Sequence, residues 1–193
     1  MKQFLNTINS STQRELRLDI SKLVVSVGST PSLYQLNSDC NIPNLEIHPG
    51  NYTLFDRQQL WANVCTEADV AGRVLARVIG HYPDRNGIML DAGATALTKE
   101  TTPQGGYGSI CGFPDLECFK MSQEVMLARP RNGSNFCRLP YEKLPLGSVL
   151  SILPNHSCLA AAYFDKYHVI DDTTNSFSSK EEVVETWIPA KFW

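Results

Sequence analysis

The feature that most constrains the fold is a succession of short β-rich segments between residues 70 and 188, separated by turns rich in Gly, Pro and Asn. The clearest pair joins Val70–His81 to Ile88–Leu90 through Tyr82–Gly87, which ends in the Asn-Gly typical of a β-hairpin. Many short strands with such turns are typical of an antiparallel barrel or sandwich, so the fold class is predicted to be mainly β. Further strands are expected at Glu117–Leu127, Gly147–Leu153, Cys158–Tyr163, His168–Ile170 and Val183–Ile188.

The N-terminal part of the chain has a different pattern. Leu23–Val27 is an unbroken β-branched run of the kind found in strands that are buried on both faces of an α/β fold. A short helix is expected before it, at Thr12–Ser21, and a polar segment with two prolines follows at Gln35–Pro49. We therefore predict a short α/β remnant of a TIM-type barrel at residues 1–44 and a β domain at residues 45–193.

Charge and hydropathy exclude several classes of protein. The net charge is −3, and the absence of a basic patch argues against a nucleic-acid partner. No apolar run reaches the roughly 20 residues that span a bilayer, so a membrane is not expected as a partner. The N-terminus lacks the apolar core of a signal peptide, so we expect a cytoplasmic protein. The six scattered cysteines are accordingly expected as reduced thiols.

His156 and Cys158 are the candidate metal ligands. If residues 154–159 are extended, side chains two positions apart point to the same face of the strand. A neutral imidazole and a thiolate on one face suit zinc, and two protein ligands leave positions open for water or substrate. The alternative is a hydrogen-bonded histidine beside a buried thiol, and the spacing alone does not separate the two interpretations.

Three further segments are candidates for ligand binding. Gly28, Ser29 and Thr30 follow the β-branched run, and their amides and hydroxyls could hold a phosphate, although Gly and Ser are also common in ordinary turns. Tyr52 could place a catalytic hydroxyl in a cleft, or it could be a half-buried aromatic residue. Asp91, at a strand end, could orient a ligand or form an Asx turn.

Six segments, taken together, resemble a known family, although no single one of them is specific. They are Val25–Pro31, Glu46–Tyr52, Leu90–Leu97, Pro154–Cys158, Val184–Trp187 and Lys191–Trp193. In this order and spacing they resemble the C-terminal portion of the D-serine dehydratase and D-threonine aldolase family, whose fold is similar to that of alanine racemase. The resemblance covers nearly the whole chain.

The resemblance implies an N-terminal α/β barrel that holds pyridoxal phosphate (PLP) and a C-terminal β domain that completes the active site, usually in a homodimer. It assigns zinc to His156 and Cys158, and the PLP phosphate to Gly28, Ser29 and Thr30. D-threonine aldolases tend to have Asp as the second metal ligand, so Cys158 favours the dehydratase. The implied lyase converts D-serine to pyruvate and ammonia, with PLP as electron sink and zinc stabilising the departing hydroxyl.

The chain departs from the family pattern in two places. No lysine stands in the context of the family's Schiff-base lysine, which lies near the start of the barrel. Ser122–Met126 stands where the family shows Glu-His-Gly, with Val125 and Met126 in place of the histidine and the glycine. We therefore expect this chain to be inactive alone. The alternatives are a part of a D-threonine aldolase-like lyase, a non-catalytic metal-binding or interaction module, and a chain that pairs with a barrel-bearing chain.

Overall fold

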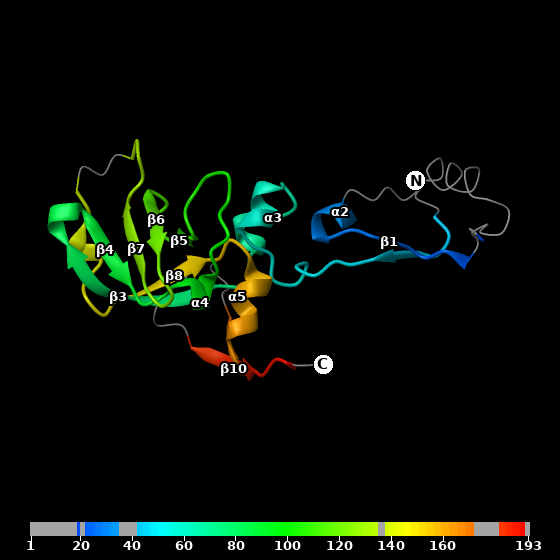
Figure 1. Cartoon of the computed structure of the whole chain (residues 1–193). Coiled ribbons are helices and arrows are strands. Elements are labelled where there is room, and N and C mark those ends of the chain that lie inside the picture. The colour runs from blue at the N-terminus through cyan, green and yellow to red at the C-terminus, as the bar shows by residue number, and fades with distance from the viewer. Residues whose placement is uncertain (1–18, 20–21, 35–41, 135–137, 172–181, 192–193) are drawn as a thin grey trace. The chain divides into compact units, whose positions relative to one another are not determined.

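The computed structural model describes residues 19, 22–34, 42–134, 138–171 and 182–191 (Figure 1). The chain divides into two compact units, Met1–Gly50 and Asn51–Trp193, so the division falls a few residues after the predicted boundary at residue 44. The helix predicted at Thr12–Ser21 lies outside the described residues, apart from Asp19. No helix in the described part of the chain has the length and apolar character needed to cross a membrane.

The first unit contains a parallel pair of strands with a helix between them in sequence. β1 (Val25–Val27) pairs with β2 (Leu45–Ile47), and α2 (Thr30–Tyr34) lies in the connection. Parallel strands joined through a helix are the arrangement that the β-branched run predicted. Burial on both faces is not found, because β1 has a single neighbouring strand among the described residues and Val24 is 59% exposed.

The second unit is built on six antiparallel strands. They are β3 (Val74–Tyr82), β4 (Gly87–Leu90), β5 (Ser109–Ile110), β6 (Leu116–Met121), β7 (Met126–Pro130) and β8 (Val149–Leu153). Their order is β5-β8-β3-β4-β7-β6, and the sheet curls into a nearly closed barrel (Figure 1). The two edge strands approach each other, since the Tyr107 N–H before β5 donates to the Cys118 carbonyl in β6 over 2.9 Å. The predicted mainly β fold class is confirmed.

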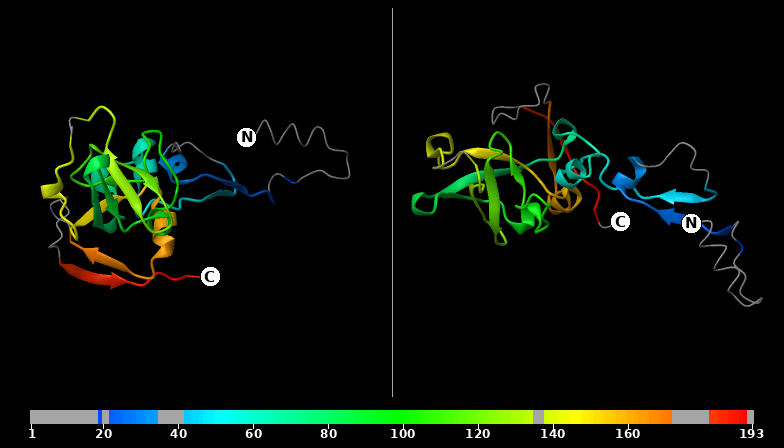
Figure 2. Two further views of the ribbon diagram at one scale, coloured as in Figure 1. Left: turned by 60° about the vertical axis from the view of Figure 1, so that its left-hand side comes forward. Right: turned by 90° about the horizontal axis from the view of Figure 1, so that it is seen from above.

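A two-stranded ribbon and several short helices complete the second unit. β9 (Tyr167–Ile170) and β10 (Val183–Trp187) pair antiparallel outside the barrel (Figure 2), as the strand pattern predicted. The helices are α3 (Arg57–Trp61), η3 (Glu67–Asp69), η4 (Pro83–Arg85), α4 (Ala94–Leu97), η5 (Tyr141–Lys143) and α5 (Ser157–Tyr163).

Alternation along β3 shows why these residues form a barrel. Val74, Ala76 and Val78 are buried, whereas Leu75 and Ile79 are exposed, because successive side chains of a strand point to opposite faces. The inward side chains of the other strands join them in one core. Its completely buried members include Ile88, Leu90, Leu97, Cys118, Met126, Ala128, Leu144 and Ile152.

The hairpin between β3 and β4 is confirmed. Asn86 adopts a left-handed backbone conformation with φ of 47°, which asparagine tolerates better than most residues. Its Oδ1 atom accepts a hydrogen bond from the Leu139 N–H over 2.8 Å. The same asparagine therefore makes the turn and anchors a distant loop to it.

Two predicted strands are wrong. The segment Glu117–Leu127 is not one strand but the end of β6, a turn and the start of β7, and the Ser122 N–H closes the turn on the Val125 carbonyl over 2.9 Å. The segment Cys158–Tyr163 is helical and belongs to α5. Three consecutive alanines, the strongest helix formers, occupy its centre at residues 160–162.

α4 begins directly against the turn between β6 and β7. The Ala94 N–H donates to the Ser122 carbonyl over 2.9 Å, and the Thr95 N–H donates to the Gln123 carbonyl over 3.1 Å. A Cβ atom at Gly93 would overlap the Gln123 carbonyl. The close approach of the backbones of residues 93 and 123 therefore explains why residue 93 is a glycine.

We expect Gly93→Ala to destabilise the protein by about 1–3 kcal/mol, because the added methyl group forces a backbone shift. Urea unfolding measures the change in free energy. Gly50→Ala is the control, since an added Cβ there meets nothing within 4 Å and its unfolding curve should not move. Equal free energies of unfolding for the two variants would contradict the close contact between Gly93 and Gln123.

Cys118 should be the least reactive of the described cysteines. Burial raises the pKa of its thiol to about 12, so at pH 8 only roughly one thiol in ten thousand is ionised. We expect iodoacetamide to label the partly exposed Cys65, Cys111 and Cys158 in the native protein and to label Cys118 only after denaturation. Peptide mass mapping reports each site, and labelling of native Cys118 as fast as Cys111 would refute the closed barrel interior.

Candidate metal-binding site

The segment Pro154–Cys158 joins β8 to α5. His156 is the N-cap residue of α5, with φ −138° and ψ 98°, and its carbonyl accepts the Ala160 N–H over 3.1 Å. Cys158 is the second residue of the helix. The predicted extended geometry of this segment is therefore wrong, and the two candidate ligands instead come from the N-cap and first turn of one helix.

Asn155 fixes this segment from inside the protein. Its side chain is completely buried, its Oδ1 atom accepts from Arg57 Nη1 over 2.6 Å, and its Nδ2 atom donates to the carbonyls of Glu100 and Gly106 over 2.7 and 2.9 Å. The Arg57 and Gln58 N–H groups at the start of α3 donate to the carbonyls of residues 154 and 155. The first N–H groups of a helix have no partner within it, and here this segment supplies partners.

Asp56 joins α3 to α5. Its buried carboxylate caps α3, because Oδ1 accepts the Gln59 N–H over 3.0 Å. Its Oδ2 atom accepts the Ser157 N–H, the first of α5, over 2.9 Å, and it also accepts the Asn51 side-chain amide. The Ser157 hydroxyl donates to Asn51 Oδ1 over 2.6 Å. Figure 1 shows α3 above α5 at the same end of the barrel.

A carboxylate holds the imidazole of His156. Glu100 Oε2 lies 2.8 Å from His156 Nδ1, and the same oxygen accepts the Gln58 side-chain amide over 2.6 Å. The hydrogen bond from His156 lowers the pKa of Glu100 and that from Gln58 assists, against the opposing effect of burial. An ionised carboxylate only accepts hydrogen bonds, so Nδ1 carries a proton, and in the neutral imidazole Nε2 is then the nitrogen with the free lone pair.

Cys158 is a free, half-buried thiol. Burial raises its pKa, and the carboxylate of Asp56 raises it further. Among the described residues no group of three or more His, Cys, Asp or Glu side chains is arranged to hold a metal ion. His156 and Cys158 remain the two candidate ligands that the described residues offer.

The candidate phosphate-binding residues lie in the first unit. Gly28 follows β1 with φ of 105°, a backbone conformation that favours glycine, and Thr30 begins α2 with its side chain buried. The Ser29 hydroxyl lies 3.4 Å from the Ser32 hydroxyl. The sequence Gly-Ser-Thr thus forms a strand-to-helix turn, which is compatible with both interpretations made from the sequence.

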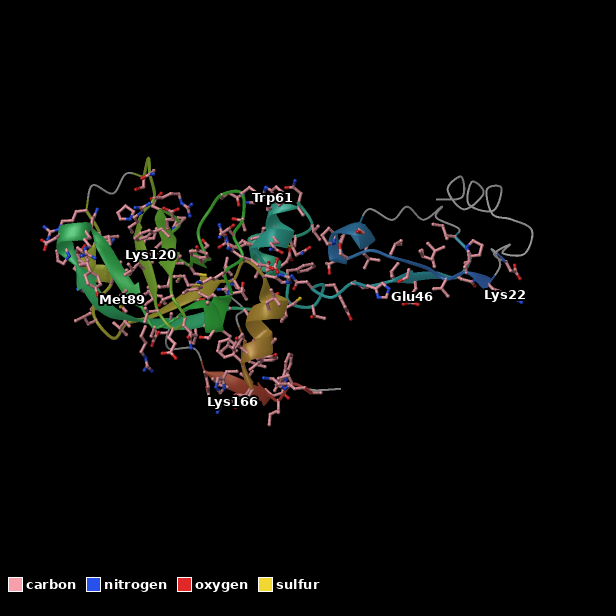
Figure 3. The ribbon with its side chains drawn as sticks, in the orientation of Figure 1. Lys22, Glu46, Trp61, Met89, Lys120 and Lys166 are labelled. Carbon is pink, nitrogen blue, oxygen red and sulfur yellow. The ribbon has the colours of Figure 1, made fainter. Side chains whose placement is uncertain are left out.

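The remaining candidates lie in the second unit. Tyr52 is 54% exposed. Asp91 Oδ1 accepts the Arg77 N–H over 2.5 Å and so links β4 to β3 rather than pointing to a ligand. His81 bonds to the Leu144 carbonyl over 2.7 Å through Nε2, a contact within the fold. Trp61, on α3 and labelled in Figure 3, is more than half exposed.

Comparison with known proteins decides the family. Residues 71–170 match the family model described as a putative serine dehydratase domain, which is just over half of the chain. The chain belongs to the D-serine dehydratase domain family. It is 32% identical to the D-serine dehydratase of Schizosaccharomyces pombe, over 98% of this chain and 46% of that protein. The resemblance found in the sequence is confirmed.

Solved structures of this family share the fold. D-threo-3-hydroxyaspartate dehydratase from Delftia sp. HT23 superimposes with a TM-score of 0.72 at 32% identity, over 88% of this chain and 45% of that one. A histidine-to-alanine mutant of an enzyme of that name, and a cysteine-to-alanine mutant in its metal-free form, superimpose with TM-scores of 0.72 and 0.71. Each is 30% identical to this chain, which covers 43% of the histidine mutant and 45% of the cysteine mutant.

An alanine racemase-like protein from Idiomarina loihiensis superimposes with a TM-score of 0.69 at 28% identity, over 88% of this chain and 44% of that protein. The likeness to alanine racemase that the sequence predicted is therefore found in the fold. The chain spans less than half the length of each relative named here.

Sequence reasoning about this D-serine dehydratase-like domain missed the polar residues that position His156. Glu100, Gln58 and Arg57 carry no motif that marks them, because their role depends on contacts with residues up to 98 positions away. Asp56 did carry a signal, since Asp is a favoured N-cap residue and it stands directly before a helix.

We expect Asp56→Ala to cost about 2–4 kcal/mol of stability, because it removes a helix cap and leaves buried donors of Asn51 and Ser157 without an acceptor. Asp69→Ala is the matched control. Asp69 also accepts the backbone N–H and hydroxyl of an N-cap residue, Thr66, but it does so in solvent, and we expect a much smaller loss. Urea unfolding of both variants checks the difference, and similar losses would refute the buried cap.

Proposed function

We propose that this chain is the metal-binding portion of a PLP- and zinc-dependent dehydratase that converts D-serine, or a related β-hydroxy D-amino acid, to a keto acid and ammonia. The observation that carries the proposal is the pair His156 and Cys158 at the start of α5, with the imidazole nitrogen Nε2 left available. The names of the S. pombe and Delftia relatives support the class of substrate.

The residues present fit a zinc ion. Imidazole nitrogen and thiolate sulfur are both common zinc ligands, and a site with two protein ligands leaves room for water and a substrate oxygen. The solved mutants of D-threo-3-hydroxyaspartate dehydratase replace a histidine and a cysteine that are separated by one residue, as are His156 and Cys158, and the cysteine mutant is in the metal-free form. Zinc, when bound, supplies a Lewis acid toward the hydroxyl that leaves.

The residues of the first unit are compatible with a phosphate group. In our proposal the turn Gly28-Ser29-Thr30 holds the phosphate of PLP, at the end of β1 and the start of α2. PLP, when bound, supplies the electron sink for loss of the α-proton. We also propose that the protein is a cytoplasmic homodimer and that the Tyr52 hydroxyl is a candidate catalytic group.

Cys158 favours the dehydratase within this proposal. D-threonine aldolases tend to place Asp at the equivalent position. A carboxylate and a thiolate donate different amounts of electron density to a metal ion. In the proposed dehydratase, His156 and the half-buried Cys158 would bind the metal. The proposal therefore concerns β-hydroxy substrates that lose water rather than substrates that lose an aldehyde.

Elemental analysis of the purified chain tests the proposal. We expect near-stoichiometric zinc in the wild type and loss of zinc in both His156→Ala and Cys158→Ala, because each removes one of two protein ligands. His168→Ala and Cys65→Ala are the matched controls and should retain zinc, since they lie on the ribbon and beyond α3. Zinc that is absent, or that is indifferent to the first two substitutions, would overturn the proposal.

A further inference from the structure

We infer that Glu100 is the positioning residue of the metal site: it fixes the tautomer and orientation of His156 so that Nε2 faces the metal. The inference rests on the proposed function. In this scheme Glu100 acts through His156: its Oε2 atom lies 2.8 Å from His156 Nδ1 and accepts Gln58 Nε2 over 2.6 Å.

Glu100 is itself held in place through its backbone. Its carbonyl accepts the Asn155 side-chain amide over 2.7 Å, and its N–H lies 3.4 Å from the Thr98 hydroxyl. Asn155 is adjacent to His156 in the chain and is completely buried. Asn155 therefore holds the backbone of Glu100 and also precedes His156 in the chain. This buried asparagine helps to set the distance between the carboxylate and the imidazole.

Gln58 completes the arrangement from a third element. It belongs to α3, whose first N–H groups bond to residues 154 and 155. The side chain of Gln58 therefore reaches Glu100 from a helix that is already anchored to the segment carrying His156. Two elements thus contact a single carboxylate oxygen of the loop after α4: α3 through Gln58, and the N-cap of α5 through His156.

This arrangement has a specific chemical consequence. An imidazole in water exchanges its proton between the two nitrogens and rotates about its side-chain bonds. A carboxylate on Nδ1 selects the form in which Nε2 is the unprotonated nitrogen, and it increases the donor strength of Nε2 toward a metal. Loss of such a partner typically lowers metal affinity about 10–100-fold.

The same contact should matter little for folding. The side chains of His156 and Glu100 are 29% and 39% exposed, and ion pairs at such positions contribute little to stability. A residue that served the fold alone would change the unfolding midpoint and leave the imidazole unaffected. A positioning residue changes the zinc affinity and the imidazole tautomer while the metal-free protein unfolds at the same temperature.

The test measures zinc affinity by competition with a chromophoric chelator on the full chain. We expect Glu100→Ala to weaken zinc binding about 10–100-fold and Glu100→Gln to weaken it less, because the amide oxygen still accepts a hydrogen bond without the charge. Glu117→Ala is the matched control. Glu117 is a partly exposed carboxylate paired with Arg129 at 3.6 Å, and its removal should leave zinc affinity unchanged.

Nitrogen NMR of the metal-free protein provides the second readout. We expect His156 in the wild type to carry its proton on Nδ1, and the tautomers to mix in Glu100→Ala. Unchanged zinc affinity in Glu100→Ala, beside a wild type that binds zinc through His156 and Cys158, would overturn this inference and leave the proposed function intact. A wild-type proton on Nε2 would also overturn it. A wild type that binds no zinc would overturn the proposed function itself.

Discussion

The buried carboxylate of Asp56 is the interaction on which the arrangement of the candidate site depends. It accepts hydrogen bonds from the N-terminal N–H groups of α3 and α5 and from Asn51. A charge buried in this way is tolerated because all its donors come from backbone and amide groups, and because the N-termini of two helices face it. Together with the buried side chain of Asn155, this carboxylate fixes the point at which α5 begins after β8.

The barrel and the polar site are two distinct kinds of structure in the second unit. The barrel interior is apolar and is filled by alternating side chains of its six strands. The polar network instead joins α3, α5 and the loop around Glu100 and Gly106, outside the strands of the sheet. Changes of the network can therefore alter ligand affinity without removing a side chain from the core.

Much of the barrel could be predicted from the sequence, because its information is local. Alternation marks β3, and Asn86-Gly87 marks the hairpin. The turn at Ser122–Val125 was missed because it contains no Gly, Pro, Asn or Asp, and the helix at Ser157–Tyr163 was missed because its short alanine run has no amphipathic period. Glu100 could not be found at all, since only the fold brings it to His156, 56 positions away.

The contact between α4 and the turn of β6 and β7 bears on how this family can change its sequence. α4 binds the turn through the carbonyls of Ser122 and Gln123, and Gly93 packs on the backbone of Gln123. Backbone carbonyls are the same whatever side chains the turn carries. The path of the turn is thereby constrained through its backbone, so the side chains of Ser122 and Gln123 can change without loss of this contact.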